Sequence, residues 1–345
     1  MPATMYQKLV ATRYHDTFRG AVAIVTAPLT QPQAGELLIR NRYAGVNAGF
    51  DTLSCQGKVP YINLVPPFDV GVEAVGEVVA IGLGVTGFQV GDAVATTGRG
   101  GGYREYQRLP AQQAIAIPSA IPEILTLMPT GVSALVALAQ AGEMGQGETV
   151  LITAAAGGTG HLAVQLALLA GNRVIAVCGS DAKAQRLQTL PIVQQGDRPG
   201  LRIVNYRRES LDAVLAQEYP QGIDLMFDCV GQQVFDTGLK HLAVRGRLVV
   251  VGFISEYAAG LETVTQPRVY EQLFWKAASV RGFLMPHYAK HFAAARDRLL
   301  ALFHTGQLQV WVDPQPFVGI AAIPDAVEYL LSGQSCGKVV VQLAN

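Results

Sequence analysis

A chain of 345 residues, half of them apolar, is long enough for two domains with a sizeable core. Its 26 basic and 26 acidic residues give a formal net charge of zero, which argues against a nucleic-acid or anionic-membrane partner. The four cysteines are scattered singly, so neither a disulfide framework nor a structural zinc site is expected.

The sequence carries no clear targeting signal. We expect no apolar run to reach the roughly 20 residues that a membrane span needs. The first residues lack the apolar core of a secretory signal, and the chain does not end in Ser-Lys-Leu. A cytoplasmic protein is therefore expected.

Residues 1–124 contain short β-like runs separated by Gly and Pro, such as AVAIV at 21–25. This spacing predicts a β-rich, barrel-like domain. The Pro-rich segment 57–68 is expected to form a loop beside a cleft. A helical pattern follows from about Pro122 to Gln140, and its apolar composition is typical of a buried helix.

The stretch from Thr149 to Ser180 predicts a strand, a glycine turn, a helix and a second strand. This order is typical of the first βαβ unit of a dinucleotide fold. The turn is expected to hold a pyrophosphate against the helix N-terminus, although such a turn also serves as a purely structural link. Its binding candidates are Ala156, Gly157, Gly158, Thr159 and Gly160.

Strands and helices continue to alternate after this unit. Strands are predicted at 201–205, 223–228, 247–251 and 279–283, and helices at 210–219, 232–242, 266–278 and 289–305. The pattern predicts an α/β fold, with a doubly wound parallel sheet of six strands. A surface loop is expected at 194–200. We expect 125–308 to form the Rossmann domain, and 309–345 to return to complete the first domain.

Several motifs resemble the medium-chain dehydrogenase/reductase superfamily over nearly the whole chain. They are GVNAGFDT (45–52), VGVEAVGEVVAIG (70–82), GGYREY (101–106), AAAGGTG (154–160) and GKVVV (337–341). GRLVVVGFIS (246–255) and FLMPHY (283–288) resemble its prostaglandin reductase 3 group. The resemblance implies a GroES-like barrel beside a Rossmann domain, a homodimer, and a zinc-free, NADPH-dependent reductase of carbon–carbon double bonds conjugated to a carbonyl.

The zinc ligands of the related alcohol dehydrogenases are replaced in this sequence. Their positions read Asn47, Val72 and Leu127-Met128, which do not make a site with three protein ligands. Glu73 alone is expected to be a structural acid. No metal is therefore expected.

The end of the second Rossmann strand favours NADPH over NADH. An NAD enzyme usually presents an acid there, but the small residues Gly179 and Ser180 follow Cys178 and would leave room for a 2′-phosphate. Lys183 and the superfamily tyrosine, Tyr206, would contact the 2′-phosphate. Alternatively, Lys183 and Arg207 are solvated, Ser180 or Asp181 caps the helix, and Asp181 would repel a phosphate if it pointed inward.

Other cofactor contacts are carried over from the resemblance by position. Those expected to line the adenosine and nicotinamide channel are Cys229, Val230, Gly231, Gly252, Phe253, Ile254, Ser255, Phe283 and Leu284. Weaker candidates for the nicotinamide end are Asn47, Ser133, Ser335 and Lys338, each with a structural alternative.

An enone reductase needs a hydrogen-bond donor for the enolate oxygen. The catalytic candidates are Tyr257, which matches a substrate-contacting tyrosine of related reductases, and Tyr61 in the loop at 57–68; Tyr288 is a third. His161 is expected to pack or to contact the helix start. Substrates would be a 2-alkenal or a 15-oxo-prostaglandin-like lipid. The alternatives are a quinone oxidoreductase and a non-catalytic NADPH-binding protein.

Overall fold

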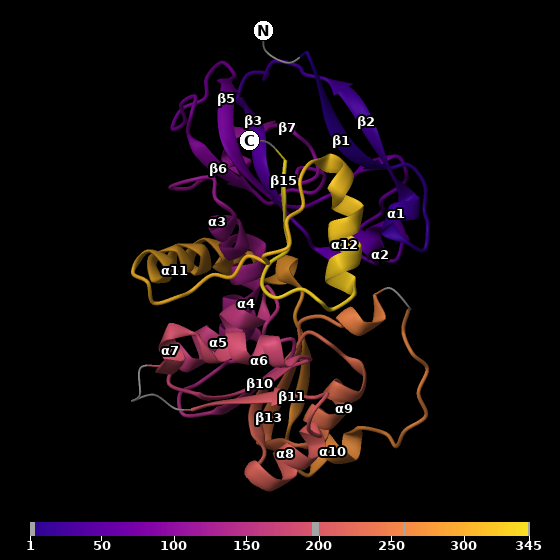
Figure 1. Cartoon of the computed structure of the whole chain (residues 1–345), viewed down its shortest axis with the longest axis vertical. Coiled ribbons are helices and arrows are strands. Elements are labelled where there is room, and N and C mark those ends of the chain that lie inside the picture. The colour runs from indigo at the N-terminus through magenta and orange to yellow at the C-terminus, as the bar shows by residue number, and fades with distance from the viewer. Residues whose placement is uncertain (1–3, 195–199, 258–259, 344–345) are drawn as a thin grey trace. The chain divides into compact units, whose positions relative to one another are not determined.

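The computed structural model describes residues 4–194, 200–257 and 260–343 (Figure 1). The chain divides into two compact units, Met1–Pro129 with Val312–Asn345, and Thr130–Trp311. The surface loop expected at 194–200 lies almost wholly outside the described residues.

The unit formed by Thr130–Trp311 contains the predicted parallel sheet. Its order is β11-β10-β9-β12-β13-β14, which confirms the doubly wound fold and puts the switch point between β9 and β12. The strands are β9 (Thr149–Ile152), β10 (Arg173–Cys178), β11 (Leu201–Asn205), β12 (Ile223–Asp228), β13 (Leu242–Val250) and β14 (Ser279–Gly282).

Helices connect these strands, and most begin close to the predicted positions. They are α5 (Gly160–Leu169), α6 (Asp181–Gln188), α7 (Pro191–Gln194), α8 (Leu211–Glu218), α9 (Gln232–Lys240), α10 (Tyr270–Phe274) and α11 (Phe292–His304). Two of the predicted helices were too long. The helix expected at 232–242 ends at Lys240 because β13 already begins at Leu242, and only Tyr270–Phe274 of the stretch 266–278 is helical.

The apolar run at Pro122–Ala141 corrects one expectation. It is 20 residues long with a mean hydropathy of 1.6, long and apolar enough to cross a membrane by length and composition alone. However, 72% of its most apolar window is buried within the structure, as in a core helix. The run is made of α3 (Pro122–Thr126), a π-helical turn (Leu127–Gly131), α4 (Val132–Val136) and a second π-helical turn (Ala137–Ala141).

The unit formed by Met1–Pro129 and Val312–Asn345 is β-rich, as predicted. A six-stranded antiparallel sheet runs β15-β3-β5-β6-β8, with β7 also paired to β3, and a second sheet runs β2-β1-β4. The strands are β1 (Met5–Ala11), β2 (Val22–Pro28), β3 (Glu36–Gly45), β4 (Phe68–Asp69), β5 (Ala74–Ile81), β6 (Ala93–Thr96), β7 (Tyr106–Pro110), β8 (Ile115–Ala116) and β15 (Val340–Gln342).

These sheets are accompanied by α1 (Phe18–Ala21), α2 (Ala48–Cys55) and α12 (Ile323–Leu331), and α3 contacts β3 and β5. A buried apolar cluster joins residues from both ends of the chain, including Phe18, Tyr103 and Val327. The C-terminal segment therefore contributes to the core of this unit as well as to its sheet.

Candidate functional site

The glycine turn leads from the carboxyl end of β9 directly into α5. Gly160 is the first residue of α5, and a Cβ built on it would lie only 2.2 Å from the carbonyl oxygen of Ala154. Glycine is therefore required for the helix to begin this close to the strand. The first N–H groups of a helix lack intrahelical partners, so this turn can hold an anion.

The end of β10 is shaped for close approach by a tyrosine. A Cβ built on Gly179 would lie 2.5 Å from the Tyr206 hydroxyl oxygen, so the two residues that the sequence assigned to one phosphate lie together. Ser180 caps α6, because its Oγ accepts from the Lys183 N–H at 3.3 Å. The capping alternative is therefore correct for Ser180, and a phosphate role for Lys183 stays a prediction.

Asp181, which would repel a phosphate if it pointed inward, is held by Asn205, the last residue of β11, and by Arg208 in the turn that follows. Its Oδ1 accepts from Asn205 Nδ2 at 2.7 Å and its Oδ2 from Arg208 Nη2 at 2.6 Å. The Arg208 hydrogen bond, followed by that of Asn205, holds the pKa of this carboxyl below its usual value. Asn205 and Arg208 were missed by sequence reasoning, which had considered only the exposed Arg207 nearby.

Asp228, also missed, organises the loop after β12. Its carboxylate is buried and accepts from the hydroxyl of Thr153 at 2.8 Å and from the N–H groups of Val230 and Gly231 at 3.0 and 3.1 Å. Thr153 in turn accepts from the Cys229 N–H. In the sequence, the available signal was an acidic residue at the end of an apolar strand. The hydrogen bonds of Asp228 fix the backbone of residues 229–231, which were predicted to bind the cofactor.

The loop after β13 interlocks with this segment. The N–H of Ile254 donates to the Cys229 carbonyl at 3.1 Å, and the Ser255 hydroxyl donates to the Val230 carbonyl at 2.5 Å. The structure thus brings the predicted sets 229–231 and 252–255 together at the carboxyl edge of the sheet, where dinucleotides bind in such folds.

Tyr257 lies beside the same loop. Its hydroxyl accepts from the Phe253 N–H at 3.2 Å, and the two rings are 4.6 Å apart. Phe283 follows β14 and its ring is 5.0 Å from that of Tyr288; Leu284 comes directly after Phe283. Tyr257 therefore lies beside residues that are predicted to bind the cofactor. Its role as a catalytic hydrogen-bond donor stays a prediction.

Asn47 and Lys338, predicted at the nicotinamide end, meet in the interior of the β-rich unit. Asn47 Nδ2 donates to Glu73 Oε1 at 2.7 Å, while Lys338 Nζ lies 2.7 Å from the same oxygen and 3.1 Å from Asn47 Oδ1. An ammonium thus lies beside the Glu73 carboxylate, near the position at which related alcohol dehydrogenases have a zinc ligand. Ser335 is buried in this unit, whereas Ser133 lies on α4 of the other.

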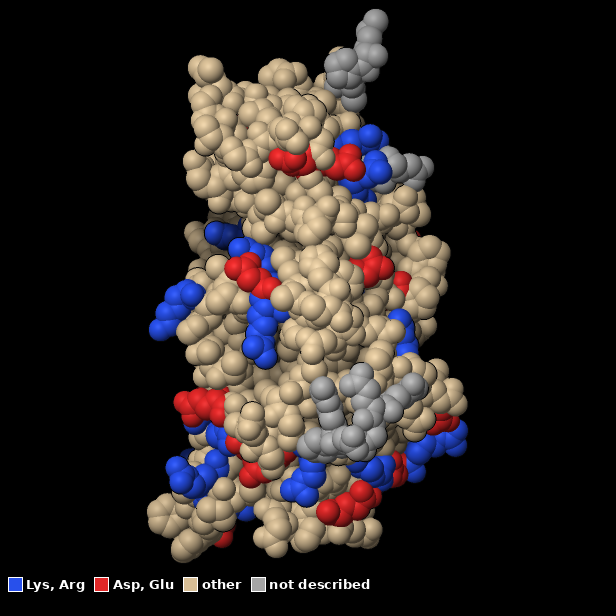
Figure 2. All heavy atoms as spheres, turned by 90° about the vertical axis from the view of Figure 1, so that its left-hand side faces the viewer, with Lys and Arg blue, Asp and Glu red and all other residues tan. Residues whose placement is uncertain are grey.

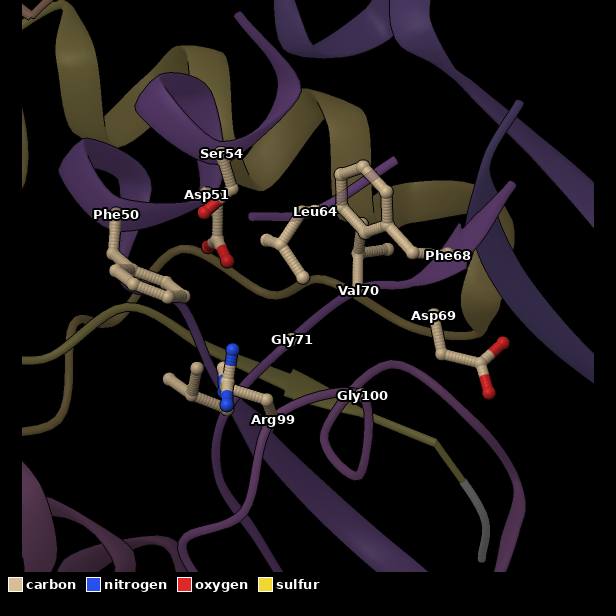
Figure 3. Close-up of a pocket in the computed structure, with 11 residues that line it drawn as sticks. Phe50, Asp51, Ser54, Leu64, Phe68, Asp69, Val70, Gly71, Arg99 and Gly100 are labelled. Atoms are coloured by element: carbon tan, nitrogen blue, oxygen red, sulfur yellow. The ribbon is translucent and has the colours of Figure 1, made fainter. Parts of the chain in front are cut away.

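Tyr61 lies in the β-rich unit and is half exposed; burial raises its pKa, against the opposing charge of Arg99. Part of its loop borders a small hollow of about 20 Å³ (Figure 3). The labelled side chains around the hollow include Phe50, Asp51, Leu64, Phe68 and Arg99.

No group of three or more His, Cys, Asp or Glu side chains in the described ranges could hold a metal ion. On the face shown in Figure 2, basic and acidic side chains are interspersed and form no large patch of one sign. This face therefore has the mixed charge expected from the composition.

Comparison with known proteins identifies relatives of both units. Residues 33–119 match the alcohol dehydrogenase GroES-like domain family, and residues 158–301 match the family described as zinc-binding dehydrogenase. The chain is 42% identical to prostaglandin reductase-3 of Mus musculus, covering 99% of this chain and 90% of the relative. It is 35% identical to a probable quinone oxidoreductase of Leishmania amazonensis, with 98% of each chain covered.

Among solved structures, a mycobacterial protein in complex with NADPH is similar along almost all of both chains. The TM-score is 0.79 and the sequences are 26% identical, with 98% of this chain and 99% of the other covered. The fold of this chain is thus similar to that of a protein solved with NADPH.

Proposed function

Because the chain belongs to the medium-chain dehydrogenase/reductase superfamily, we propose that it is an NADPH-dependent reductase of carbon–carbon double bonds conjugated to a carbonyl. The observation that carries the proposal is the glycine turn of β9 and α5. β10 lies next to β9 in the sheet, and it is followed by Gly179 in place of an acid, with Tyr206 from the end of β11 against this glycine. The similarity to prostaglandin reductase-3 supports an enal, enone or 15-oxo-prostaglandin-like substrate.

The residues present fit the cofactor. The turn at 156–160 would hold the pyrophosphate, and Gly179 with Tyr206 would receive the 2′-phosphate, since Asp181 is engaged by Asn205 and Arg208. NADPH, when bound, supplies the hydride that such a reduction needs. We propose that residues 229–231 and 252–255 orient the nicotinamide half.

Tyr257 is the proposed donor to the substrate oxygen that becomes an enolate. A preorganised hydroxyl stabilises charge developing on that oxygen. A phenol with a pKa of about 10 donates a hydrogen bond readily, whereas it is a slow source of a whole proton near neutrality. Tyr61 and Tyr288 are the lesser candidates for the same role.

We propose that no metal takes part, because Lys338 supplies the positive charge beside Glu73 that a metal ion would otherwise bring. The second candidate activity is quinone reduction, favoured by the similarity to the Leishmania protein. A quinone needs the same hydride but no donor placed for an enolate.

A panel of 2-alkenals, enones and quinones, assayed by NADPH oxidation, tests these activities. Enone reduction that falls with Tyr257→Phe, at unchanged NADPH affinity, supports the proposal. Quinone turnover alone favours the second activity, binding without oxidation indicates a non-catalytic NADPH-binding protein, and the absence of binding refutes the proposal.

We further propose a homodimer joined at the edge of the parallel sheet. β14 is the edge strand, and nearby Tyr270, Phe274 and Trp275 are largely exposed. Large exposed aromatics beside the free edge of a sheet are typical of an interface. Light scattering of the wild type and of a Phe274→Glu, Trp275→Glu variant tests this proposal. A cytoplasmic location stays a prediction.

A further inference from the structure

Two aromatic rings are stacked at the start of α5. The imidazole of His161 and the indole of Trp311 are 5.1 Å apart between centroids, with an angle of 5° between their planes. Both side chains are almost completely buried. His161 follows the glycine turn directly, whereas Trp311 is 150 residues away in the chain, at the end of the same unit.

The hydrogen bonds of His161 define its tautomer. Its Nε2 lies 3.0 Å from the backbone nitrogen of Trp311, and its Nδ1 lies 2.8 Å from the carbonyl oxygen of Gly157. A backbone N–H can only donate, so Nε2 accepts, and the proton of the neutral ring is on Nδ1. That proton is donated to the Gly157 carbonyl. Burial is the main reason that the pKa of this ring falls to about 4, so the ring stays neutral at physiological pH.

The Gly157 carbonyl is therefore held by two donors, His161 Nδ1 and the His161 backbone N–H, which lies 3.1 Å from it. A peptide held in this way cannot rotate to bring its carbonyl oxygen toward a phosphate, which would repel it. The N–H groups of Gly157 and His161 already donate to the carbonyls of Ala154 and Gly157, so an anion would be met by the other N–H groups of the turn.

The segment that brings Trp311 to His161 is fastened to the same helix. Gln165 of α5 donates to the Gln309 carbonyl and accepts from the Gln309 N–H, both at 2.8 Å. The indole N–H donates to the Gln309 side chain at 3.1 Å. Trp311 thus has a fixed place beside α5.

Trp311 also contacts the second helix of the predicted site. The guanidinium of Arg186, on α6, lies 4.5 Å from the centroid of a Trp311 ring, a cation–π contact. α6 begins at the Ser180 cap and carries Lys183 in its first turn. One indole therefore links the helix expected at the pyrophosphate to the helix expected at the 2′-phosphate.

We propose that His161 and Trp311 are positioning residues for the dinucleotide: His161 sets the pyrophosphate turn through Gly157, and Trp311 ties that turn to α6. The inference rests on the dinucleotide binding proposed above. Because the pyrophosphate is common to NADH and NADPH, the His161 contact serves both cofactors. The Arg186 contact serves chiefly the one that carries a 2′-phosphate.

Two amide substitutions separate the two ring nitrogens. His161→Asn places an amide N–H near the position of Nδ1 and keeps the donor to Gly157, whereas His161→Gln places its amide near Nε2 and loses that donor. We expect His161→Asn to bind NADPH within about threefold of the wild type, and His161→Gln to bind NADPH and NADH about tenfold more weakly, the usual effect of one hydrogen bond. Dissociation constants come from fluorescence titration, with urea unfolding as the control for folding.

Trp311→Leu tests the link to α6, with Trp311→Phe as the variant that keeps an aromatic ring. Trp311→Leu is expected to weaken the binding of NADPH more than that of NADH. Trp311→Phe is expected to regain most of the NADPH affinity that Trp311→Leu loses. Equal affinities of the Asn and Gln variants at position 161, or equal losses for both cofactors in Trp311→Leu, would overturn the inference. A wild type that binds neither cofactor refutes the proposed function instead.

Discussion

Lys338 and Glu73 form an ion pair inside the β-rich unit, with 2.7 Å between Nζ and Oε1 and both side chains at most 5% exposed. Lys338 also donates to the Val46 carbonyl and to the side chain of Asn47. Two charges can remain this deeply buried because they are paired and hydrogen-bonded.

Removing one partner of this pair is expected to leave the other uncompensated. We predict that Glu73→Gln or Lys338→Met alone lowers the free energy of unfolding by about 3–5 kcal/mol. The double variant is expected to lose less than the sum, since no unpaired charge remains. Urea unfolding of the four proteins measures this. Additive losses would contradict the ion-pair account.

The same pair leads to a prediction on metals. A divalent cation near Glu73 would meet the ammonium of Lys338, and Asn47 offers only an amide. Dialysis of the purified enzyme against a chelator is therefore expected to leave NADPH oxidation unchanged. Elemental analysis is the control: stoichiometric zinc, lost together with activity, would disprove this prediction.

The pH dependence of stability is predicted from two buried groups with opposite effects. Asp51 is buried, accepts from the Tyr103 hydroxyl at 2.5 Å, and has a pKa raised by burial to about 7. Between about pH 4 and 7 the folded state keeps a proton that the unfolded state has lost, so stability falls as pH rises. His161 has a folded pKa of about 4, below its usual 6.5, so its contribution is complete above pH 6.5 and is lost as pH falls toward 4.

These two slopes oppose each other over the same range, and each amounts to about 3–4 kcal/mol, since the pKa of Asp51 rises from 3.8 to about 7 and that of His161 falls from 6.5 to about 4. Asp51→Asn removes the slope that is due to Asp51. The free energy of unfolding of this variant is expected to rise steeply from pH 4 to 6.5. Urea unfolding across this range measures it, with His161→Asn as the opposite control. A profile of Asp51→Asn that matches the wild type would rule out this assignment.

The strands of the parallel sheet could be predicted because each is a short, mostly apolar run between stretches with a helical pattern. The start of β13 could not, because Arg245 and Gly246 interrupt its apolar pattern, and Arg245 has a φ of 62°. The contact between His161 and Trp311 could not be predicted either, since it joins residues 150 positions apart. Sequence patterns report periodicity, whereas such partners depend on how distant segments pack.

The glycine turn offers a matched pair of substitutions. A Cβ at Gly160 would lie 2.2 Å from the Ala154 oxygen, but a Cβ at Gly157 would lie 3.1 Å from the same atom. Gly160→Ala is therefore expected to displace the start of α5, with at least a tenfold loss of NADPH affinity and lower stability. Gly157→Ala should keep the fold. Titration and thermal unfolding measure both, and a Gly160→Ala variant that binds as tightly as the wild type would exclude this role for the close approach.

The contact between Gly179 and Tyr206 predicts how the protein distinguishes its cofactors. A Cβ at Gly179 would lie 2.5 Å from the Tyr206 hydroxyl, so Gly179→Ala must displace the tyrosine ring, half of which is exposed. If that ring borders a 2′-phosphate, Gly179→Ala is expected to weaken the binding of NADPH by about tenfold, which is the loss expected for a hydrogen bond to a charged group. The binding of NADH should weaken much less. Tyr206→Phe keeps the ring and removes only the hydroxyl, and should give the same selective loss. Dissociation constants for both cofactors decide the outcome. Equal losses of affinity for NADPH and NADH would mean that the 2′-phosphate does not lie beside Tyr206. Lys183 on α6 would then be the residue to test.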